Sequence, residues 1–268
     1  MKATKLSVIT LASTIILAGI VPITADAETT KTADTTGKVQ FKAPTDPSGP
    51  VIKPGSKDEE VVPETGNKTT GALRLDHVPS IDFGIVEARA QAQTFESNNE
   101  KLVETKEGTS TNLYSPNFIQ VTDERGVDGD WKVTVAGTVF AAQTGENLPN
   151  TKISIKEKSS FNNVYDFLTT PDTSDRIEAF SGALDISNDG TAKEVLKTKA
   201  GKHTSGSKTS LVFNKDYTLA SLPNYEAPNA ENTKGKNAGI VLEKPLSDTV
   251  TIDVQYTSTL TWTLSSAL

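Results

Sequence analysis

One stretch near the end of the chain, Thr249 to Leu264, constrains the fold more than any other. It reads TVTIDVQYTSTLTWTL, and apolar residues occupy every second position except Ser258. Successive side chains of a β-strand point to opposite faces, so this period of two predicts a strand with one apolar face and one threonine face. The stretch is rich in β-branched residues and contains no Gly or Pro, which favours the same structure. A straight strand of this length would span roughly 50 Å, so we expect a bend near Ser258.

The region from residue 71 onward shows many short alternating runs separated by turn residues. The clearest is Trp131 to Phe140 (WKVTVAGTVF), while apolar residues at helical spacing occur over Ser160 to Leu168. Asn98 to Asn112 is polar and charged, and we expect a loop there. Short strands with long polar loops indicate an all-β fold. We predict a single β-sandwich or barrel-like domain over residues 71–268, with at most one or two short helices.

Two segments precede this domain. Residues 1–27 have an early positive charge, an uncharged apolar stretch and the small residues Ala25 and Ala27, the pattern of a cleaved secretory signal peptide. The apolar stretch is shorter than the roughly 20 residues of a membrane-spanning helix, so no transmembrane anchor is expected. Residues 28–70 are rich in Pro, Thr and charged residues, which predicts a disordered linker. We therefore expect a secreted protein.

Composition and motif spacing argue against several classes of function. The chain has no cysteine and a formal net charge of −7, so thiolate chemistry is excluded and nucleic acid is not an expected partner. His77 and His203 are far apart in sequence, and we expect both to be solvated surface residues rather than members of a catalytic triad. Asp123 to Asp130 is acidic, but it lacks the ligand spacing of a calcium loop. We expect no catalytic residue, metal or cofactor. Cleavage of a glycan by paired carboxylates of this acidic stretch is a further and weaker hypothesis.

Two short motifs are similar to sortase signals. They are Val62 to Gly66 (VPETG) and Leu148 to Thr151 (LPNT). A working signal lies near the C-terminus and is followed by an apolar segment and basic residues, and neither motif has that context. Covalent attachment to a cell wall through either motif is therefore not expected.

The two tryptophans, Trp131 and Trp262, each begin an apolar strand face, with an aliphatic residue two places further on. They are either core anchors or partly exposed platforms on which sugar rings or a partner's aromatic groups stack. If the two strand ends meet, the rings form one site. The candidate binding residues are Trp131, Val133, Leu260, Trp262 and Leu264. We expect Val250 to Tyr256 to build the core instead.

These residues resemble the WxL domain of Gram-positive cell-surface proteins. Tyr256 to Leu264 (YTSTLTWTL) is similar to the distal motif of that family, and Asp130 to Val133 (DWKV) to the proximal one, with Val133 in place of leucine. Leu73 to Gly84 (LRLDHVPSIDFG) is similar to the opening strands. The resemblance covers residues 71–268. It implies non-covalent attachment to the cell wall, with peptidoglycan as the ligand, and a surface complex with a WxL-interacting protein and other WxL proteins. The alternative is an interaction subunit that docks such a partner and is retained on the wall indirectly.

Overall fold

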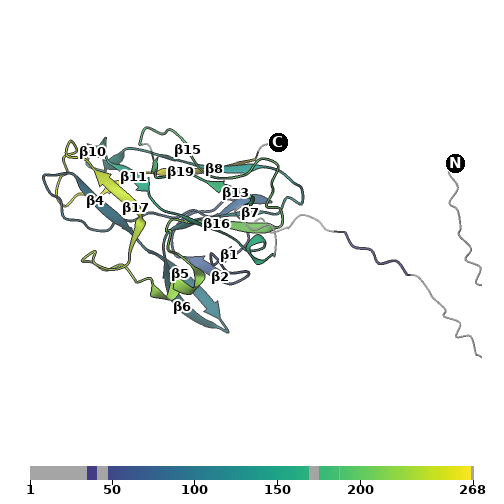
Figure 1. Cartoon of the computed structure of the whole chain (residues 1–268). Coiled ribbons are helices and arrows are strands. Elements are labelled where there is room, and N and C mark those ends of the chain that lie inside the picture. The colour runs from purple at the N-terminus through teal and green to yellow at the C-terminus, as the bar shows by residue number, and fades with distance from the viewer. Residues whose placement is uncertain (1–34, 41–47, 169–174, 187, 267–268) are drawn as a thin grey trace, which may run out of the picture. The chain divides into compact units, whose positions relative to one another are not determined.

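The computed structural model describes residues 35–40, 48–168, 175–186 and 188–266. The expected signal peptide, 1–27, and residues 28–34 and 41–47 of the expected linker lie outside these ranges. Residues 35–40 contain neither helix nor strand, and their side chains are exposed. From residue 48 onward β-strands dominate (Figure 1), which confirms the predicted all-β class. No helix in the described ranges is long and apolar enough to cross a membrane.

Antiparallel sheets of three or four strands make up the domain. The first sheet contains β1 (Val51–Ile52), β2 (Glu60–Pro63), β5 (Glu100–Lys106) and β6 (Thr109–Ser115). The second contains β12 (Ser159–Asn162), β16 (Ser207–Val212), β7 (Phe118–Asp123) and β3 (Leu73–His77). The third contains β13 (Ile177–Ala179), β15 (Lys193–Thr198), β8 (Trp131–Gly137) and β19 (Leu260–Ser266). The fourth contains β14 (Leu184–Ile186), β11 (Lys152–Ile155), β17 (Lys236–Lys244) and β4 (Gln93–Asn98). The smallest contains β10 (Asn147–Leu148), β9 (Phe140–Ala142) and β18 (Tyr256–Thr257). The described residues also include two 3-10 helices, η1 (Tyr165–Phe167) and η3 (Leu219–Asn224).

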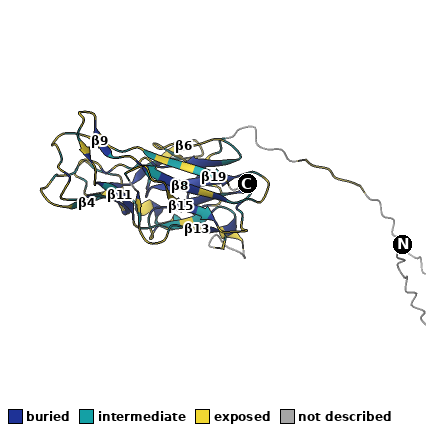
Figure 2. Ribbon diagram, turned by 90° about the horizontal axis from the view of Figure 1, so that it is seen from above, coloured by how far each residue is buried: buried dark blue, intermediate teal, exposed yellow. Residues whose placement is uncertain are grey.

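Strand β7 separates two hydrophobic cores, and all six of its residues are buried. Ile119 and Val121 face the larger core, between the β12-β16-β7-β3 and β13-β15-β8-β19 sheets. Phe118 faces a second core with Val51 and Leu102, against the sheet that contains β1 and β5. Three of the sheets therefore stack as layers (Figure 1). Along β8 and β19 the more buried and the exposed residues alternate (Figure 2), as the period of two predicts.

The structure corrects the predicted boundary between linker and domain. Strands β1 and β2 fall within the stretch expected to be disordered, yet Val51 and Val61 are buried. The Gln120 side chain acts as a β-partner for Ile52: its Oε1 accepts from the Ile52 amide at 2.9 Å, and its Nε2 donates to the Ile52 carbonyl at 2.7 Å. These strands are two and four residues long; they pair with each other, and their remaining partners, Gln120 and β5, lie far along the chain. No local pattern therefore reveals them.

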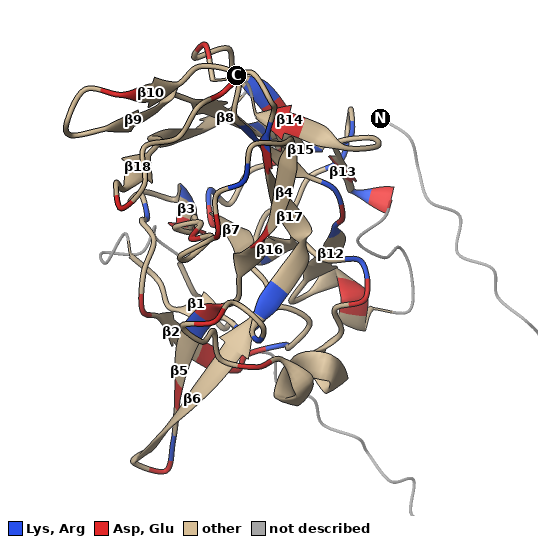
Figure 3. Cartoon of the chain, turned by 90° about the vertical axis from the view of Figure 1, so that its left-hand side faces the viewer, with Lys and Arg blue, Asp and Glu red and all other residues tan. Residues whose placement is uncertain are grey.

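The loop expected over Asn98–Asn112 is also corrected. This stretch forms most of the β5–β6 hairpin, which projects from one end of the domain (Figure 3). Glu107 and Gly108 have positive φ angles of 50° and 79°, the conformation that a tight two-residue hairpin turn requires. Leu102 anchors the hairpin in the second core, with no exposed surface. The polar composition concealed the strands because most of β6 faces solvent.

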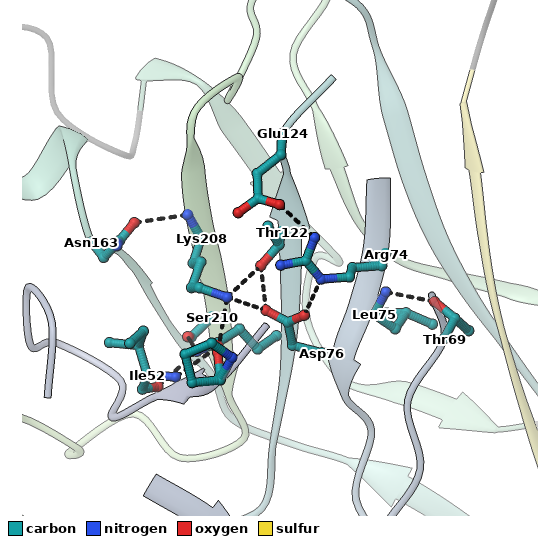
Figure 4. Close-up of polar contacts among 12 residues, drawn as sticks. Ile52, Thr69, Arg74, Leu75, Asp76, Thr122, Glu124, Asn163, Lys208 and Ser210 are labelled. Carbon is teal, nitrogen blue, oxygen red and sulfur yellow. Dashed lines mark hydrogen bonds and ion pairs between the residues drawn. The ribbon is translucent and has the colours of Figure 1, made fainter. Parts of the chain in front are cut away.

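A buried ionic network joins β3, β7 and β16 (Figure 4). The Asp76 carboxylate accepts from Arg74 Nε at 2.6 Å, from Lys208 Nζ at 2.5 Å and from the Thr122 hydroxyl. Lys208 Nζ also donates to the carbonyl of Pro50 at 2.9 Å. The network therefore fixes the chain just before β1 to the central sheet.

Candidate functional site

The two W-x-aliphatic motifs lie side by side in the structure. Strands β8 and β19 pair antiparallel, with Val133 opposite Leu264 and Val135 opposite Trp262. Trp131 begins β8 and lies opposite Ser266. The five predicted binding residues thus lie on two neighbouring strands. All of them belong to the larger core or pack against it.

Trp131 and Val133 are core residues. Trp131 is 2% exposed and Val133 has no exposed surface. The Trp131 indole donates from Nε1 to Thr204 Oγ1 at 2.8 Å, and its backbone amide donates to Thr198 Oγ1 at 3.1 Å. Every polar hydrogen of this tryptophan therefore has an internal partner. Both side chains are buried in the larger core rather than exposed at the surface.

Trp262, Leu260 and Leu264 are only half-buried. The Trp262 ring stacks on Phe213, with ring centroids 6.1 Å apart and an interplanar angle of 22°. Its Nε1 is buried and has no hydrogen-bond partner among the described residues. A buried N–H without a partner is costly. Because this nitrogen has less than 1 Å² of exposed surface, the ring and not the N–H is the part of the indole open to a ligand.

A cleft of about 1260 Å³ lies beside this edge of the domain. Residues 78–88 line one part of it and residues 250–260 another, and Trp262 belongs to its lining. Two exposed β-branched residues from these segments, Ile85 at 85% and Ile252 at 65%, lie on the lining. Apolar side chains of this size at the surface mark interaction sites when they gather around a concavity. Nothing local in the sequence links the two segments, so sequence reasoning did not find the cleft.

The long strand expected over Thr249–Leu264 is not continuous where it lines the cleft. Only β18 and β19 are strands, and Asp253 has a left-handed φ of 63° in a turn before them. The break after Thr257 confirms the expected bend near Ser258, whose hydroxyl donates to the Thr138 carbonyl at 2.6 Å. Val250 and Tyr256 pack against the core as expected. Ile252 does not, and its predicted burial is wrong.

The charged groups that line the cleft are mostly acidic. They are Asp82, Glu87, Asp253 and Lys244. The Lys244 ammonium donates to the carbonyls of Gln91 and Pro245, each at 3.3 Å, and Glu87 forms an exposed ion pair with Arg89. Asp82 and Asp253 have no ion-pair partner within 4 Å among the described residues. The cleft borders strands β9, β10 and β18, which lie at the opposite end of the domain from the β5–β6 hairpin (Figure 3).

The acidic stretch Asp123–Asp130 is occupied by internal ion pairs. Asp123 is fully buried and pairs with Arg125 at 2.8 Å, and Glu124 pairs with Arg74 at 2.6 Å. Asp128 lies 3.1 Å from the ring of His203. Among the described residues no group of three or more His, Asp or Glu side chains is placed to hold a metal ion.

The expectation that His77 is a solvated surface residue is wrong. His77 is 2% exposed, and its Nε2 lies 2.9 Å from Glu100 Oε2. The other Glu100 oxygen accepts from the Phe118 amide at 3.0 Å, and the His77 ring packs on that of Phe118. This histidine and carboxylate therefore hold two layers of the fold together. No sequence pattern predicts this pair, because 23 residues separate its members.

Both sortase-like motifs are parts of folded structure. Val62 and Pro63 belong to β2, and Gly66 has a φ of 105° where a Cβ would collide with the Val78 carbonyl. In the other motif, Asn150 and Thr151 donate four hydrogen bonds to the Asp248 carboxylate. The residues that resemble a sorting signal thus have structural roles.

Replacing Asp248 with Asn is expected to destabilise the domain by about 1.5–3 kcal/mol, the value of hydrogen bonds to a charged group. Burial by itself raises the pKa of the Asp248 carboxyl, but the hydrogen bonds from Asn150 and Thr151 outweigh burial and lower this pKa below its ordinary value. A lowered pKa stabilises the fold above the unfolded value of about 3.9, and the stabilisation is lost as the pH falls through the folded pKa. Urea unfolding at pH 7 and pH 3 measures the effect. A gap between the wild type and the Asp248→Asn variant that does not narrow at pH 3 contradicts this assignment.

A family model described as WxL domain surface cell wall-binding matches residues 28–267. The chain belongs to this family. The match confirms the resemblance carried by the β8 and β19 motifs, and it begins upstream of the boundary predicted at residue 71, in agreement with the ordered β1 and β2 strands. The WxL family is a surface family of cell-wall-binding rather than catalytic domains, so association with the cell wall follows for this protein. No curated protein and no solved structure matches the chain.

Proposed function

We propose that this WxL domain attaches a secreted protein non-covalently to the Gram-positive cell wall, with peptidoglycan as the ligand. Residues 1–27 direct secretion, and the segment that follows them is a spacer. Membership of the wall-binding family supports the attachment. The site we assign is the cleft beside β19, reached by Leu260 and Trp262, while Trp131 and Val133 support it from the core.

One observation carries this assignment: the half-buried Trp262 lies in the lining of a large, partly apolar cleft. Aromatic rings provide the flat apolar surfaces on which sugar rings stack. The aromatic residues Phe83, Phe95 and Tyr256 also line the cleft. Its volume exceeds the roughly 300–1,000 Å³ typical of small-molecule pockets, and this suits an extended polymer better than a single small ligand.

Co-sedimentation with purified Gram-positive cell walls tests the proposal. Trp262→Ala is expected to weaken binding by about thirtyfold, the loss of about 2 kcal/mol typical of a central aromatic contact. Thr261→Ala is the matched control, because Thr261 is the neighbouring residue on the exposed face of the same strand. Thermal unfolding shows whether each variant is folded. If the Trp262→Ala variant is folded and binds walls as tightly as the wild type, the cleft is not the wall-binding site.

The exposed residues of the cleft lining allow a second test without cost to the fold. Ile85→Asp and Ile252→Asp change side chains that are mostly in solvent, so stability is expected to stay within about 0.5 kcal/mol of the wild type. Both changes place a charge beside the apolar lining, and both are expected to reduce wall binding. Unchanged binding in both variants argues against this cleft as the wall site.

The alternative function is an interaction subunit that docks a WxL-interacting partner and is retained on the wall through it. The open edge of the β13-β15-β8-β19 sheet at β19 favours this reading. Measuring binding to peptidoglycan stripped of proteins distinguishes the two functions. Binding of the purified domain to stripped peptidoglycan supports direct attachment, whereas binding that appears only after the partner is added supports the interaction subunit.

A further inference from the structure

Strand β19 is an unprotected sheet edge. It pairs with β8 and with no other strand of the described residues, and Figure 2 shows β13, β15, β8 and β19 in succession. The edge strands β4 and β13 carry exposed charged residues, Glu96 and Glu178, whereas the edge strands β6 and β12 carry none. Charges, bulges and prolines are the devices that prevent a sheet edge from pairing with another chain. The sequence of β19, LTWTLSS, contains no charge and no proline.

The register shows which backbone groups of β19 are free. The Thr138 amide donates to the Thr259 carbonyl at 3.1 Å, so Thr259 belongs to a hydrogen-bonded pair with β8. Such pairs alternate along an antiparallel ladder with pairs whose N–H and C=O groups point away from the partner strand. The amides and carbonyls of Leu260, Trp262 and Leu264 therefore point outward from the sheet.

The same three residues direct their side chains toward the larger core, which is incompletely covered at this edge. Leu73 and Ile81 are likewise apolar, only partly buried and packed against that core. An additional strand along β19 would satisfy the free backbone groups, and every second side chain of it would face this apolar surface. The cleft beside Leu260 and Trp262 provides room for those side chains.

The charge of the cleft indicates the chemistry of the added strand. Asp82, Glu87 and Asp253 outnumber Lys244, whose ammonium is held by two carbonyls. Asp253 is exposed and adjoins the exposed Ile252. Lys236 interacts electrostatically with Asp82, which leaves Asp253 as the carboxylate most available to a cation from outside.

We propose that β19 binds an extended segment of a partner protein as a fifth strand of its sheet, with apolar residues at every second position and a Lys or Arg that reaches Asp253. Main-chain hydrogen bonds to Leu260, Trp262 and Leu264 supply affinity, and the alternate side chains supply specificity, as in other cases of strand addition. This inference rests on the interaction-subunit function, and it gives that function a mode of recognition.

A library of random peptides about nine residues long, enough to span one strand, provides the test with purified protein and no cell wall present. Selected peptides are expected to show apolar residues at alternate positions and a basic residue near one end. On binding, the amides of Leu260, Trp262 and Leu264 are expected to become protected from hydrogen exchange. The amides of Thr261 and Thr263, which already bond to β8, are expected to change little. Asp253→Lys is expected to weaken the basic peptides selectively.

Two substitutions at one position separate backbone pairing from side-chain packing. Leu264→Pro and Leu264→Ala both remove the leucine side chain, but only proline removes the outward N–H, and an edge strand tolerates proline on its open side. Peptide binding is expected to be about tenfold weaker in the proline variant than in the alanine variant, the effect of one lost hydrogen bond. Circular dichroism confirms that both variants are folded.

The outcomes distinguish this inference from the proposed wall attachment. Failure to select any peptide, selection of peptides without a period of two, or equal binding by the two Leu264 variants overturns strand addition. Protection of the same amides by soluble peptidoglycan fragments but not by peptides also overturns it and identifies the cleft as a glycan site. Peptide binding without binding to stripped peptidoglycan supports the strand proposal and contradicts direct attachment.

Discussion

Replacing Trp131 with alanine is expected to lower the free energy of unfolding by about 3–5 kcal/mol, the usual cost of truncating a buried Trp. Trp131 is among the largest fully buried side chains of the domain, and its removal leaves a cavity between two sheets. The Thr204 hydroxyl, which is 1% exposed, also loses the indole donor at 2.8 Å. Because domains are typically stable by only 5–15 kcal/mol, the variant is expected to be marginally folded.

Urea unfolding measures this effect, and Trp131→Phe is the matched control. Phenylalanine fills much of the cavity but has no N–H, so its expected loss is about 1–3 kcal/mol, the cost of a buried polar group without its partner. Wall binding by Trp131→Ala is expected to fall only with the folded fraction. If Trp131→Ala keeps wild-type stability and yet loses wall binding, the core role is contradicted, and Trp131 contacts the ligand instead.

The pairing of β8 with β19 is the part of the site that the sequence predicts best. Both strands show apolar residues at alternate positions, and each has a tryptophan at or near its start. The structure pairs the two strands directly. A period of two identifies which side chains share a face. It does not identify whether that face meets another sheet or solvent. For this reason the sequence left the exposure of Trp131 and Trp262 open, and only the packing distinguishes a buried ring from a half-buried one.

Alternation also predicted a strand over residues 250–254, where the backbone has no partner strand. Val250, Ile252 and Val254 alternate as well as β19 does, but the left-handed turn at Asp253 prevents a continuous strand. Pairing depends on a partner strand at the right distance, and that partner is set by the rest of the fold. The same limit explains β1, whose backbone pairs partly with the Gln120 side chain. Features that depend on residues far away in the sequence could not be predicted, whereas the local β5–β6 hairpin was missed because its exposed strands are polar.

The buried ionic network was invisible for the same reason, and it leads to the second large expected effect. Asp76→Ala is expected to destabilise the domain by about 3–5 kcal/mol, the cost of breaking a buried ion pair by removal of one partner. Arg74 is 1% exposed and the Lys208 side chain 12% exposed, so neither cation can move easily into water. Both would lose their hydrogen-bond acceptor at Asp76 (Figure 4).

Two further variants show whether the cost comes from unpaired buried charge. Glu124→Ala removes the other carboxylate that contacts Arg74, but Glu124 is partly exposed, and an ion pair of that kind contributes about 1 kcal/mol or less. In the double variant Asp76→Ala with Lys208→Met, one stranded cation is replaced by an apolar side chain, so part of the lost stability is expected to return. Urea unfolding of the wild type, Asp76→Ala, Lys208→Met and the double variant measures the coupling between Asp76 and Lys208. A double variant less stable than Asp76→Ala alone implies that Lys208 stabilises the fold chiefly through the Pro50 carbonyl. In that case the main role of the network is to hold the chain before β1 against the sheet, and not to neutralise the buried charge of Asp76.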